Sequence, residues 1–191
     1  LGSVAAQSTP AKDAATGIDF QSYSAPSGFK FGIALPESGG EDFIGQIAGP
    51  LTGGNGWVGI SLGGSMRGPL LIAAWSNEGK SMGSIRKATS YSNPPVYTGA
   101  SSLKTIAAGS TANATHMTYT FLCSKCVTGD ALSFSASAPT AKMGFAMSSG
   151  KVAKASDPAT ALTYHTAGKG QYTVDLAGAK KSGFAAWAAK A

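Results

Sequence analysis

Few side chains in this sequence can bind a metal or react covalently. The histidines are His116 and His165, the cysteines are Cys123 and Cys126, and Met66 differs from the other methionines because it follows a Gly-Gly pair in a turn-like segment. A thioether in such a turn can face a pocket, whereas a strand methionine usually fills the core. On sequence alone, a partly buried packing methionine and a solvated loop histidine remain the simpler interpretations of Met66 and His165.

The two cysteines stand in the segment FLCSKCVTG. Two thiols cannot complete a four-ligand zinc site, and the two histidines lie at spacings unlike those of a zinc finger. A redox-active dithiol normally begins a helix, whereas this pair ends a strand-like run. The pattern favours a structural disulfide between Cys123 and Cys126. Covalent c-type haem is excluded because Val127 follows Cys126, where the CxxCH motif requires histidine.

The sequence Asn113-Ala114-Thr115 matches the N-glycosylation pattern, so Asn113 is a candidate glycosylation site. Together with a disulfide it favours a secreted, extracellular protein. A hydrolase is not favoured, because the candidate carboxylates lie in turn-like segments, where solvated charges are the better explanation. These carboxylates are Glu37, Glu41, Asp42 and Glu78.

The net charge of +6 comes from 15 basic and 9 acidic residues and is scattered along the chain. Nucleic-acid binding is not predicted, because such proteins cluster their basic residues and interleave aromatic ones. A diffuse positive surface can instead attract an acidic partner protein. Membrane insertion is not predicted either, because the sequence has no run of about 18 uncharged apolar residues.

From residue 28 onward the chain consists of short apolar or alternating runs that end at Gly or Pro. This pattern predicts an antiparallel sandwich or barrel. The run from Leu70 to Trp75 is apolar throughout, which predicts a central strand covered on both faces. The other predicted strands are 29–35, 43–48, 57–62, 85–89, 96–98, 103–107, 116–123, 132–136, 143–147 and 172–176.

Only the Ala-rich C-terminus shows helical spacing, with Phe184 and Trp187 three residues apart. We therefore predict an all-β fold, an antiparallel β-sandwich of about ten strands with a short C-terminal helix. A length of 191 residues suits one domain. Residues 1–16, rich in Ala, Ser and Thr, are expected to form a flexible lead-in to a domain spanning 17–191.

The strings DFIGQIAG, WVGISLGGSM, LLIAAW, RKATSY, NATH, CSKC and YHT occur in this order along the chain. Together they resemble the haem b cytochrome domain of fungal cellobiose dehydrogenase and its relatives, which include the cytochrome domains of pyrroloquinoline quinone-dependent sugar (pyranose) dehydrogenases. The resemblance covers roughly residues 17–190. It depends on the joint occurrence of a methionine in a Gly-Gly loop, a histidine about a hundred residues later and a CxxC after an N-x-T-H strand.

This resemblance implies an immunoglobulin-like β-sandwich that binds haem b non-covalently, with Met66 and His165 as the axial ligands of the iron. It also implies that Tyr91 lies near a haem propionate. His116 has no iron-binding role in the family, and strand alternation places it on a polar face.

The chain departs from the family pattern directly after His165. Ala167-Gly168-Lys169-Gly170 stands where relatives can place an aromatic side chain that packs on the porphyrin. Lys169 is therefore a candidate positive group near the exposed haem edge.

The implied function is one-electron transfer, because an iron with both axial positions filled has no open site for substrate. By resemblance, the donor is a flavin or pyrroloquinoline quinone dehydrogenase domain in the same or another chain. The acceptor is a lytic polysaccharide monooxygenase or another oxidant. The domain itself is then an electron carrier of an extracellular sugar oxidoreductase. The alternative is a haem-free β-sandwich that binds carbohydrate or protein, since sandwich folds host many functions.

Overall fold

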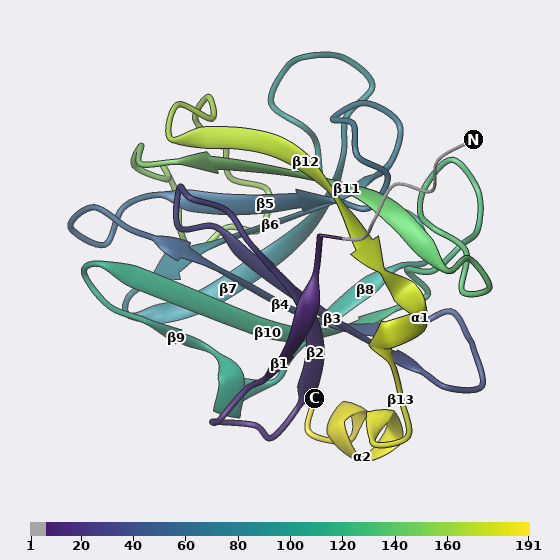
Figure 1. The fold of residues 1–191 in the computed structure, drawn as a ribbon. Helices are drawn as coiled ribbons and strands as arrows, with labels where there is room; N and C mark the ends of the chain where they lie inside the picture. The colour runs from purple at the N-terminus through teal and green to yellow at the C-terminus, as the bar shows by residue number, and fades with distance from the viewer. Residues whose placement is uncertain (1–6) are drawn as a thin grey trace.

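The computed structural model describes residues 7–191, in which two β-sheets pack face to face (Figure 1). The larger sheet has the order β1 (Thr9–Lys12), β2 (Asp19–Ser24), β3 (Lys30–Pro36), β4 (Phe43–Pro50), β10 (His116–Ser124), β8 (Ser102–Thr105), with β13 (Lys180–Lys181) beside β3 and β9 (Thr111–Ala112) beside β10. The smaller sheet has the order β12 (Gly168–Asp175), β11 (Thr140–Ser148), β5 (Trp57–Ser61), β6 (Leu70–Asn77), β7 (Lys80–Lys87). All strand pairs of the smaller sheet are antiparallel, and in the larger sheet only the pair of β13 and β3 is parallel. The predicted all-β sandwich is confirmed.

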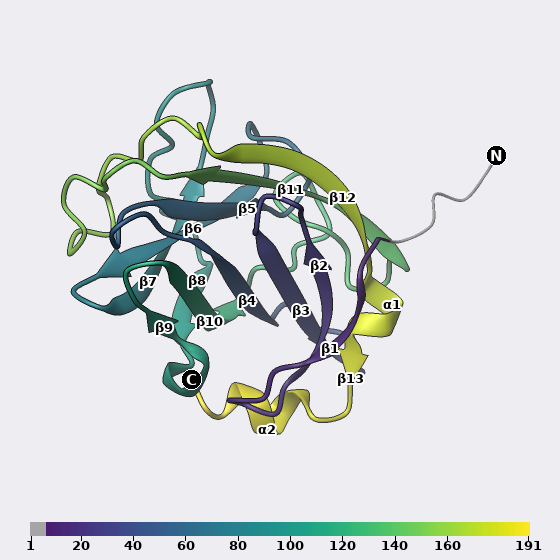
Figure 2. The ribbon, with the colours of Figure 1, turned by 60° about the vertical axis from the view of Figure 1, so that its left-hand side comes forward.

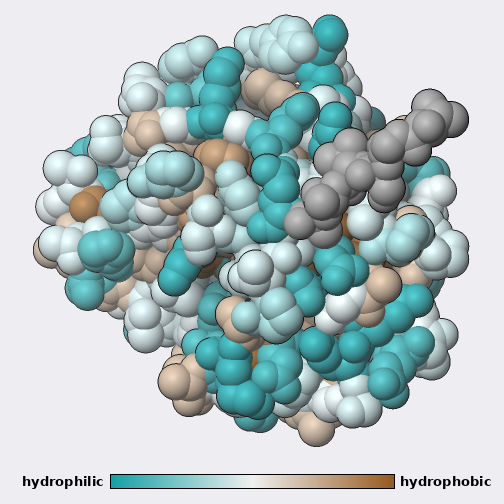
Figure 3. Space-filling view, viewed as in Figure 1, coloured by the Kyte–Doolittle hydropathy of each residue, from teal (hydrophilic) through white to brown (hydrophobic). Residues whose placement is uncertain are grey.

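Alternation along the strands builds the core between the sheets. In β10, Met117, Tyr119 and Phe121 are buried in this core, whereas His116 at the start of the strand is exposed. Val58 and Ile60 of β5 enter the same core from the smaller sheet. The surface in Figure 3 is accordingly mostly hydrophilic or neutral, with only scattered hydrophobic residues.

The outer face of the smaller sheet has unusually small side chains at its centre. The register places Gly59 of β5 between Ala73 of β6 and Ala146 of β11. These residues alternate with the core residues of their strands, so they lie in one row on the outer face. The next row contains Trp57 opposite Trp75. Because the side chains of the central row are small and those of the next row are large aromatic rings, this face of the sheet is hollow at its centre.

Most of the predicted strands are present with shifted ends. The apolar run 70–75 forms β6, an interior strand whose Ile72 and Ala74 face the main core while Ala73 and Trp75 are buried on the other face. The strand predicted at 85–89 begins earlier, as β7. Of the run 96–98, only Val96 makes a bridge, to Arg86.

The prediction of a strand at 132–136 is wrong, because this segment is a loop. Its backbone has scattered partners instead of a neighbouring strand: Leu132 N bonds to the Asp130 side chain, and Leu132 O accepts from Leu70 N. Its alternating apolar residues still have a packing role, since Phe134 is buried and its ring centroid lies 6.0 Å from that of Phe43. A loop that covers one end of the core thus imitates the pattern of a strand.

The first and last described elements both belong to the larger-sheet side of the molecule (Figure 2): β1 is an edge strand of that sheet, and the C-terminal helix packs against it. The predicted C-terminal helix is α2 (Phe184–Ala188), and its Phe184 packs in a small cluster with Ile18 and Phe20. Two further short elements were not predicted: the helix α1 (Leu176–Ala179) and the 3-10 turn η1 (Ala107–Gly109). The predicted lead-in contains strand β1, whose side chains are all exposed and so give no apolar signal. Residues 1–6 of that prediction lie outside the described part of the chain. Among the described residues, no helix is long and apolar enough to cross a membrane.

Candidate functional site

One cavity brings together the residues that the sequence singled out. Met66, Tyr91, His165 and Lys169 all line a hollow of about 840 Å³ over the small-residue row of the smaller sheet. Met66 lies in the β5–β6 loop, Tyr91 in the β7–β8 loop and His165 in the β11–β12 loop. In Figure 1 the teal β7–β8 loop stands above this sheet, and the yellow-green β11–β12 loop lies beside it. Three loops that are distant in sequence therefore form the walls of one site.

The floor of the cavity is shallow because its central side chains are minimal. Gly59 and Ala73 line it, with Gly144 and Ala146 of β11 beside them. A Cβ atom on Gly144 would approach Gly64 O to 2.8 Å, so the Met66 loop crosses β11 at a distance that only glycine permits. A flat floor flanked by loops suits a planar ligand.

The Met66 loop is fixed by its own turns and by two neighbouring side chains. Gly64 and Gly68 have φ angles of +85° and +99°, which favour glycine. Ser61 Oγ donates to Ser65 O at 2.6 Å, and Gln171 Nε2 of β12 donates to Gly64 O. These contacts leave the Met66 side chain half-buried at the cavity.

The His165 loop is held by donors that rise from the sheet below it. Trp57 Nε1 donates to Thr163 O at 3.0 Å, and the hydroxyls of Ser148 and Thr163 lie 2.7 Å apart. The His165 ring is half-buried and stacks on Tyr164, with 4.3 Å between the ring centroids. This arrangement presents an imidazole to the same cavity as the Met66 thioether.

The mouth of the cavity is aromatic and basic. Tyr91 is 76% exposed and Tyr164 is 71% exposed. The guanidinium carbon of Arg67 lies 4.3 Å from the Tyr91 ring centroid, a cation–π distance. Lys169 is also exposed at this rim. The opening therefore offers aromatic edges and positive charge to a partner.

Comparison with known proteins agrees with this geometry. A family model described as the cytochrome domain of cellobiose dehydrogenase matches residues 12–186. The chain belongs to this cytochrome-domain family. The match confirms the resemblance found in the sequence. Membership implies an electron-transfer role and a haem b cofactor for the domain.

Similar proteins are dehydrogenases with a cytochrome part. The chain is 33% identical over 193 residues to a pyrroloquinoline quinone-dependent pyranose dehydrogenase of Coprinopsis cinerea, covering 94% of this chain but only 26% of that protein. Among solved structures it resembles the cytochrome domain of Myriococcum thermophilum cellobiose dehydrogenase (TM-score 0.88, 29% identity, 98% of both chains covered). It also resembles the cytochrome b domain of pyranose dehydrogenase from Coprinopsis cinerea (TM-score 0.83, 29% identity, 96% and 95% covered). The chain thus spans about a quarter of its curated relative.

The cysteines and the second histidine of the cytochrome domain lie away from the cavity. Cys123 and Cys126 form a buried disulfide at the end of β10, as predicted. His116 is exposed, and its Nδ1 lies 3.1 Å from Thr115 Oγ1. Asn113 is exposed too, so its glycosylation stays a prediction.

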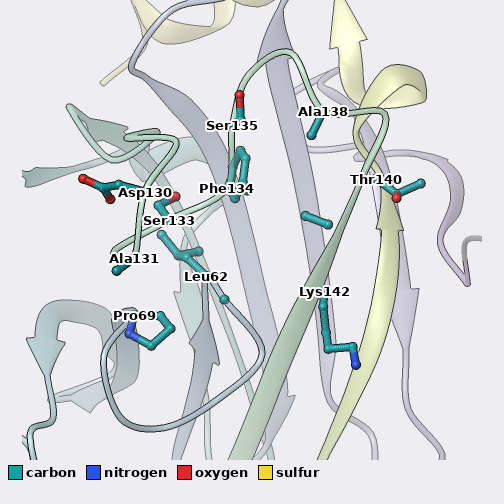
Figure 4. Close-up of a pocket in the computed structure, with 12 residues that line it drawn as sticks. Leu62, Pro69, Asp130, Ala131, Ser133, Phe134, Ser135, Ala138, Thr140 and Lys142 are labelled. Carbon is teal, nitrogen blue, oxygen red and sulfur yellow. The ribbon is translucent and has the colours of Figure 1, made fainter.

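A smaller hollow of about 380 Å³ lies on the other side of the Met66 loop (Figure 4). Leu62 and Pro69, at the two ends of that loop, line it together with Phe134 of the 125–139 loop. Its lining contains Asp130 and Lys142 but no histidine, methionine or cysteine, so it does not provide the donor atoms expected for haem iron. This hollow of the cytochrome domain lies between the ends of the Met66 loop and residues 130–138.

Several residues that shape the site belong to no functional motif in the sequence. Trp57, Arg86 and Gln171 all line the cavity and donate hydrogen bonds to loop carbonyls. Arg86 is one of the basic residues scattered along the sequence, yet it is fully buried. Burial holds the pKa of its guanidinium below the ordinary value, and the negative charge of Asp157 offsets this in part. The local sequence gives no signal for this burial, because Arg86 shares a strand face with Ser84 and a polar face is normally exposed.

Proposed function

We propose that this domain holds haem b non-covalently between Met66 and His165 and carries single electrons. The observation that supports it is that the methionine and the histidine line one cavity over a row of small residues. Nitrogen and thioether sulfur are the donor pair of low-spin cytochromes, so the residues present fit the group. A volume of about 840 Å³ also falls within the range of cofactor pockets.

The side chains of the cavity have separable roles in this proposal. Bound haem b supplies a one-electron redox centre. Met66 would hold the haem iron through its thioether and His165 through its imidazole, so that neither residue would leave the iron free to bind a substrate. Trp57 orients the His165 loop through Thr163, and Tyr91 is the candidate hydrogen-bond donor to a propionate at the mouth. The thioether favours the ferrous state and raises the potential relative to two imidazoles.

The partners follow from the relatives and from the cavity mouth. The relatives carry their cytochrome part within a sugar dehydrogenase, so the proposed donor is a flavin or pyrroloquinoline quinone domain. The proposed acceptor is a lytic polysaccharide monooxygenase or another oxidant. Arg67 and Lys169 beside the exposed Tyr91 and Tyr164 suit a docking partner with an acidic face, and such attraction weakens as salt rises.

The absorption spectrum of the purified protein loaded with haem tests the proposal. We expect a Soret band that sharpens on reduction with dithionite into a low-spin ferrous spectrum, and the same spectrum from the His116→Ala control. A protein that binds no haem would overturn the cytochrome function for this chain. The alternative, a sandwich that binds carbohydrate or protein, would then be tested by oligosaccharide titration.

We further propose that the protein is secreted and glycosylated at Asn113. The Asn113 side chain is exposed in a turn, where its Oδ1 accepts from Thr115 N and His116 N at 2.9 Å. Expression in a secretory fungal host should give a mass that falls on treatment with N-glycosidase. Asn113→Gln should have the deglycosylated mass from the start, and equal masses for both untreated proteins would contradict the proposal.

A further inference from the structure

Arg86 is a buried cation that donates to the backbone of two different loops. Its side chain is 0% exposed, and its Nε donates to Ser84 Oγ at 2.9 Å. Nη1 donates to Pro94 O at 2.9 Å, and Nη2 donates to Pro158 O at 2.6 Å and to Thr160 O at 2.9 Å. These bonds use four of the five donors that a guanidinium has. Three of these four bonds go to backbone carbonyls and one goes to a side-chain hydroxyl.

No carboxylate forms an ion pair with Arg86 within residues 7–191, where the one ion pair joins Lys12 to Asp19. A charge removed from water is costly unless its hydrogen bonds are satisfied. The three carbonyls therefore compensate Arg86, and Arg86 in turn fixes the carbonyls. Lysine cannot replace it, because an ammonium is a compact charge without the planar fork that reaches several acceptors at once.

The carbonyls belong to the loops that carry Tyr91 and His165. Pro94 follows Tyr91 in the β7–β8 loop, and Pro158 precedes His165 in the β11–β12 loop. A second bond joins the same two loops, because Leu162 N donates to Asn93 Oδ1 at 2.9 Å. Arg86 lies on β7 and lines the cavity, so one side chain ties both loops to the sheet at the site.

We propose that Arg86 is a positioning residue of the cytochrome domain, which clamps the Tyr91 and His165 loops to β7 and holds a fixed positive charge at the cavity wall. The proposal rests on the haem site proposed above. A positive charge in a medium of low dielectric stabilises the less positive, reduced state of a nearby iron. Arg86 therefore raises the reduction potential, in addition to holding the imidazole loop in place.

Two variants separate the clamp from the charge. Arg86→Lys keeps the charge but loses most of the carbonyl bonds, and Arg86→Gln loses both. Lys80→Gln is the matched control, since Lys80 is an exposed cation at the far end of the same strand. The first measurement is amide hydrogen exchange of the haem-free protein, with the Leu162 amide as reporter of the contact between the loops. The second is the spectrum and midpoint potential of the haem-loaded protein.

Both Arg86 variants should raise exchange at residues 157–165 by about tenfold or more, because bonds to a charged donor are strong, while Lys80→Gln should not. Arg86→Gln should lower the potential by more than Arg86→Lys and Lys80→Gln do. Unchanged exchange in Arg86→Lys would overturn the clamp, even if Arg86→Gln does not fold. Equal potentials in Arg86→Gln and the parent would overturn the role of the charge. If the parent binds no haem, the haem site fails, and the exchange data still decide the clamp.

Discussion

The Met66 loop and the His165 loop, on the two sides of the cavity, are held in place by different kinds of contact. Met66 lies in the short 62–69 connection, where glycines with positive φ make the turns. His165 lies near the end of the longer 149–167 connection, which contains turns but neither a helix nor a strand. One loop is ordered mainly by its own turns, and the other is long enough to need external support.

The sheet supplies that support to the longer loop. Trp57, Trp75 and Arg86 donate hydrogen bonds from the outer face of the sheet to carbonyls of residues 155–163. Trp75 Nε1, for example, donates to Ala155 O at 2.8 Å. Closing a longer loop costs more conformational entropy, so it requires more contacts. We therefore expect the histidine side to depend on side chains outside its loop and the methionine side to tolerate replacement more readily.

The largest effect is expected from His165→Ala. It removes the imidazole that lines the cavity, and the other histidine of the chain, His116, does not line it. We expect loss of the low-spin spectrum and a fall in haem affinity beyond the roughly 10–100-fold typical of losing an outer-shell partner. Absorption titration with haem measures both, with His116→Ala as control. Parent-like spectra from His165→Ala would show that the ligand assignment is wrong.

Met66→His tests the other side of the comparison. The replacement offers a second imidazole from a short, locally ordered loop, so haem should remain bound and low-spin. Its potential should fall by on the order of 0.1 V, within the ~0.8 V range over which axial ligands tune haem. Spectroelectrochemical titration against the parent measures the shift. A potential equal to that of the parent would mean that Met66 does not ligate the iron.

The same contrast explains how far the sequence could predict the molecule. Alternation predicted β10 and the exposed position of His116, because a strand with one buried face repeats every second residue. It failed at 132–136, where a loop buries Phe134 against Phe43, and at β1, whose side chains are all exposed. Local patterns carry no information on which residues meet across a fold.

The cavity shows that limit more clearly. Resemblance to a family singled out Met66 and His165, and both residues line one hollow. Neither resemblance nor pattern indicated Arg86, because a lone arginine in an alternating strand is usually solvated. Arg86 is buried because the β7–β8 and β11–β12 loops fold over its side chain, and the second of these loops is distant from it in the sequence.

A matched serine pair measures the support on each side directly. Ser61 and Ser148 each end a strand of the smaller sheet, accept from the N–H two residues later and bond to the adjoining loop. Ser61→Ala and Ser148→Ala should each cost about 1 kcal/mol, or about 2–4 °C in Tm. Calorimetry and hydrogen exchange measure the effects. Ser148→Ala should raise exchange across 160–166, and Ser61→Ala only within 63–66; the reverse pattern would contradict the comparison.

The smallest effect is expected where a third loop joins the two sides. Tyr91 stacks under Arg67 on the methionine side, and its neighbour Asn93 accepts from Leu162 on the histidine side. Tyr91→Phe keeps the ring and removes only the hydroxyl, so the low-spin spectrum should persist. Tyr91 is largely exposed, so water weakens its hydrogen bond to the charged propionate, and the loss of that bond should cost about 0.5–1.5 kcal/mol. Haem release to a scavenger protein should then become faster by up to about tenfold. Release as fast as that from His165→Ala would instead place Tyr91 among the residues that hold the cofactor most strongly.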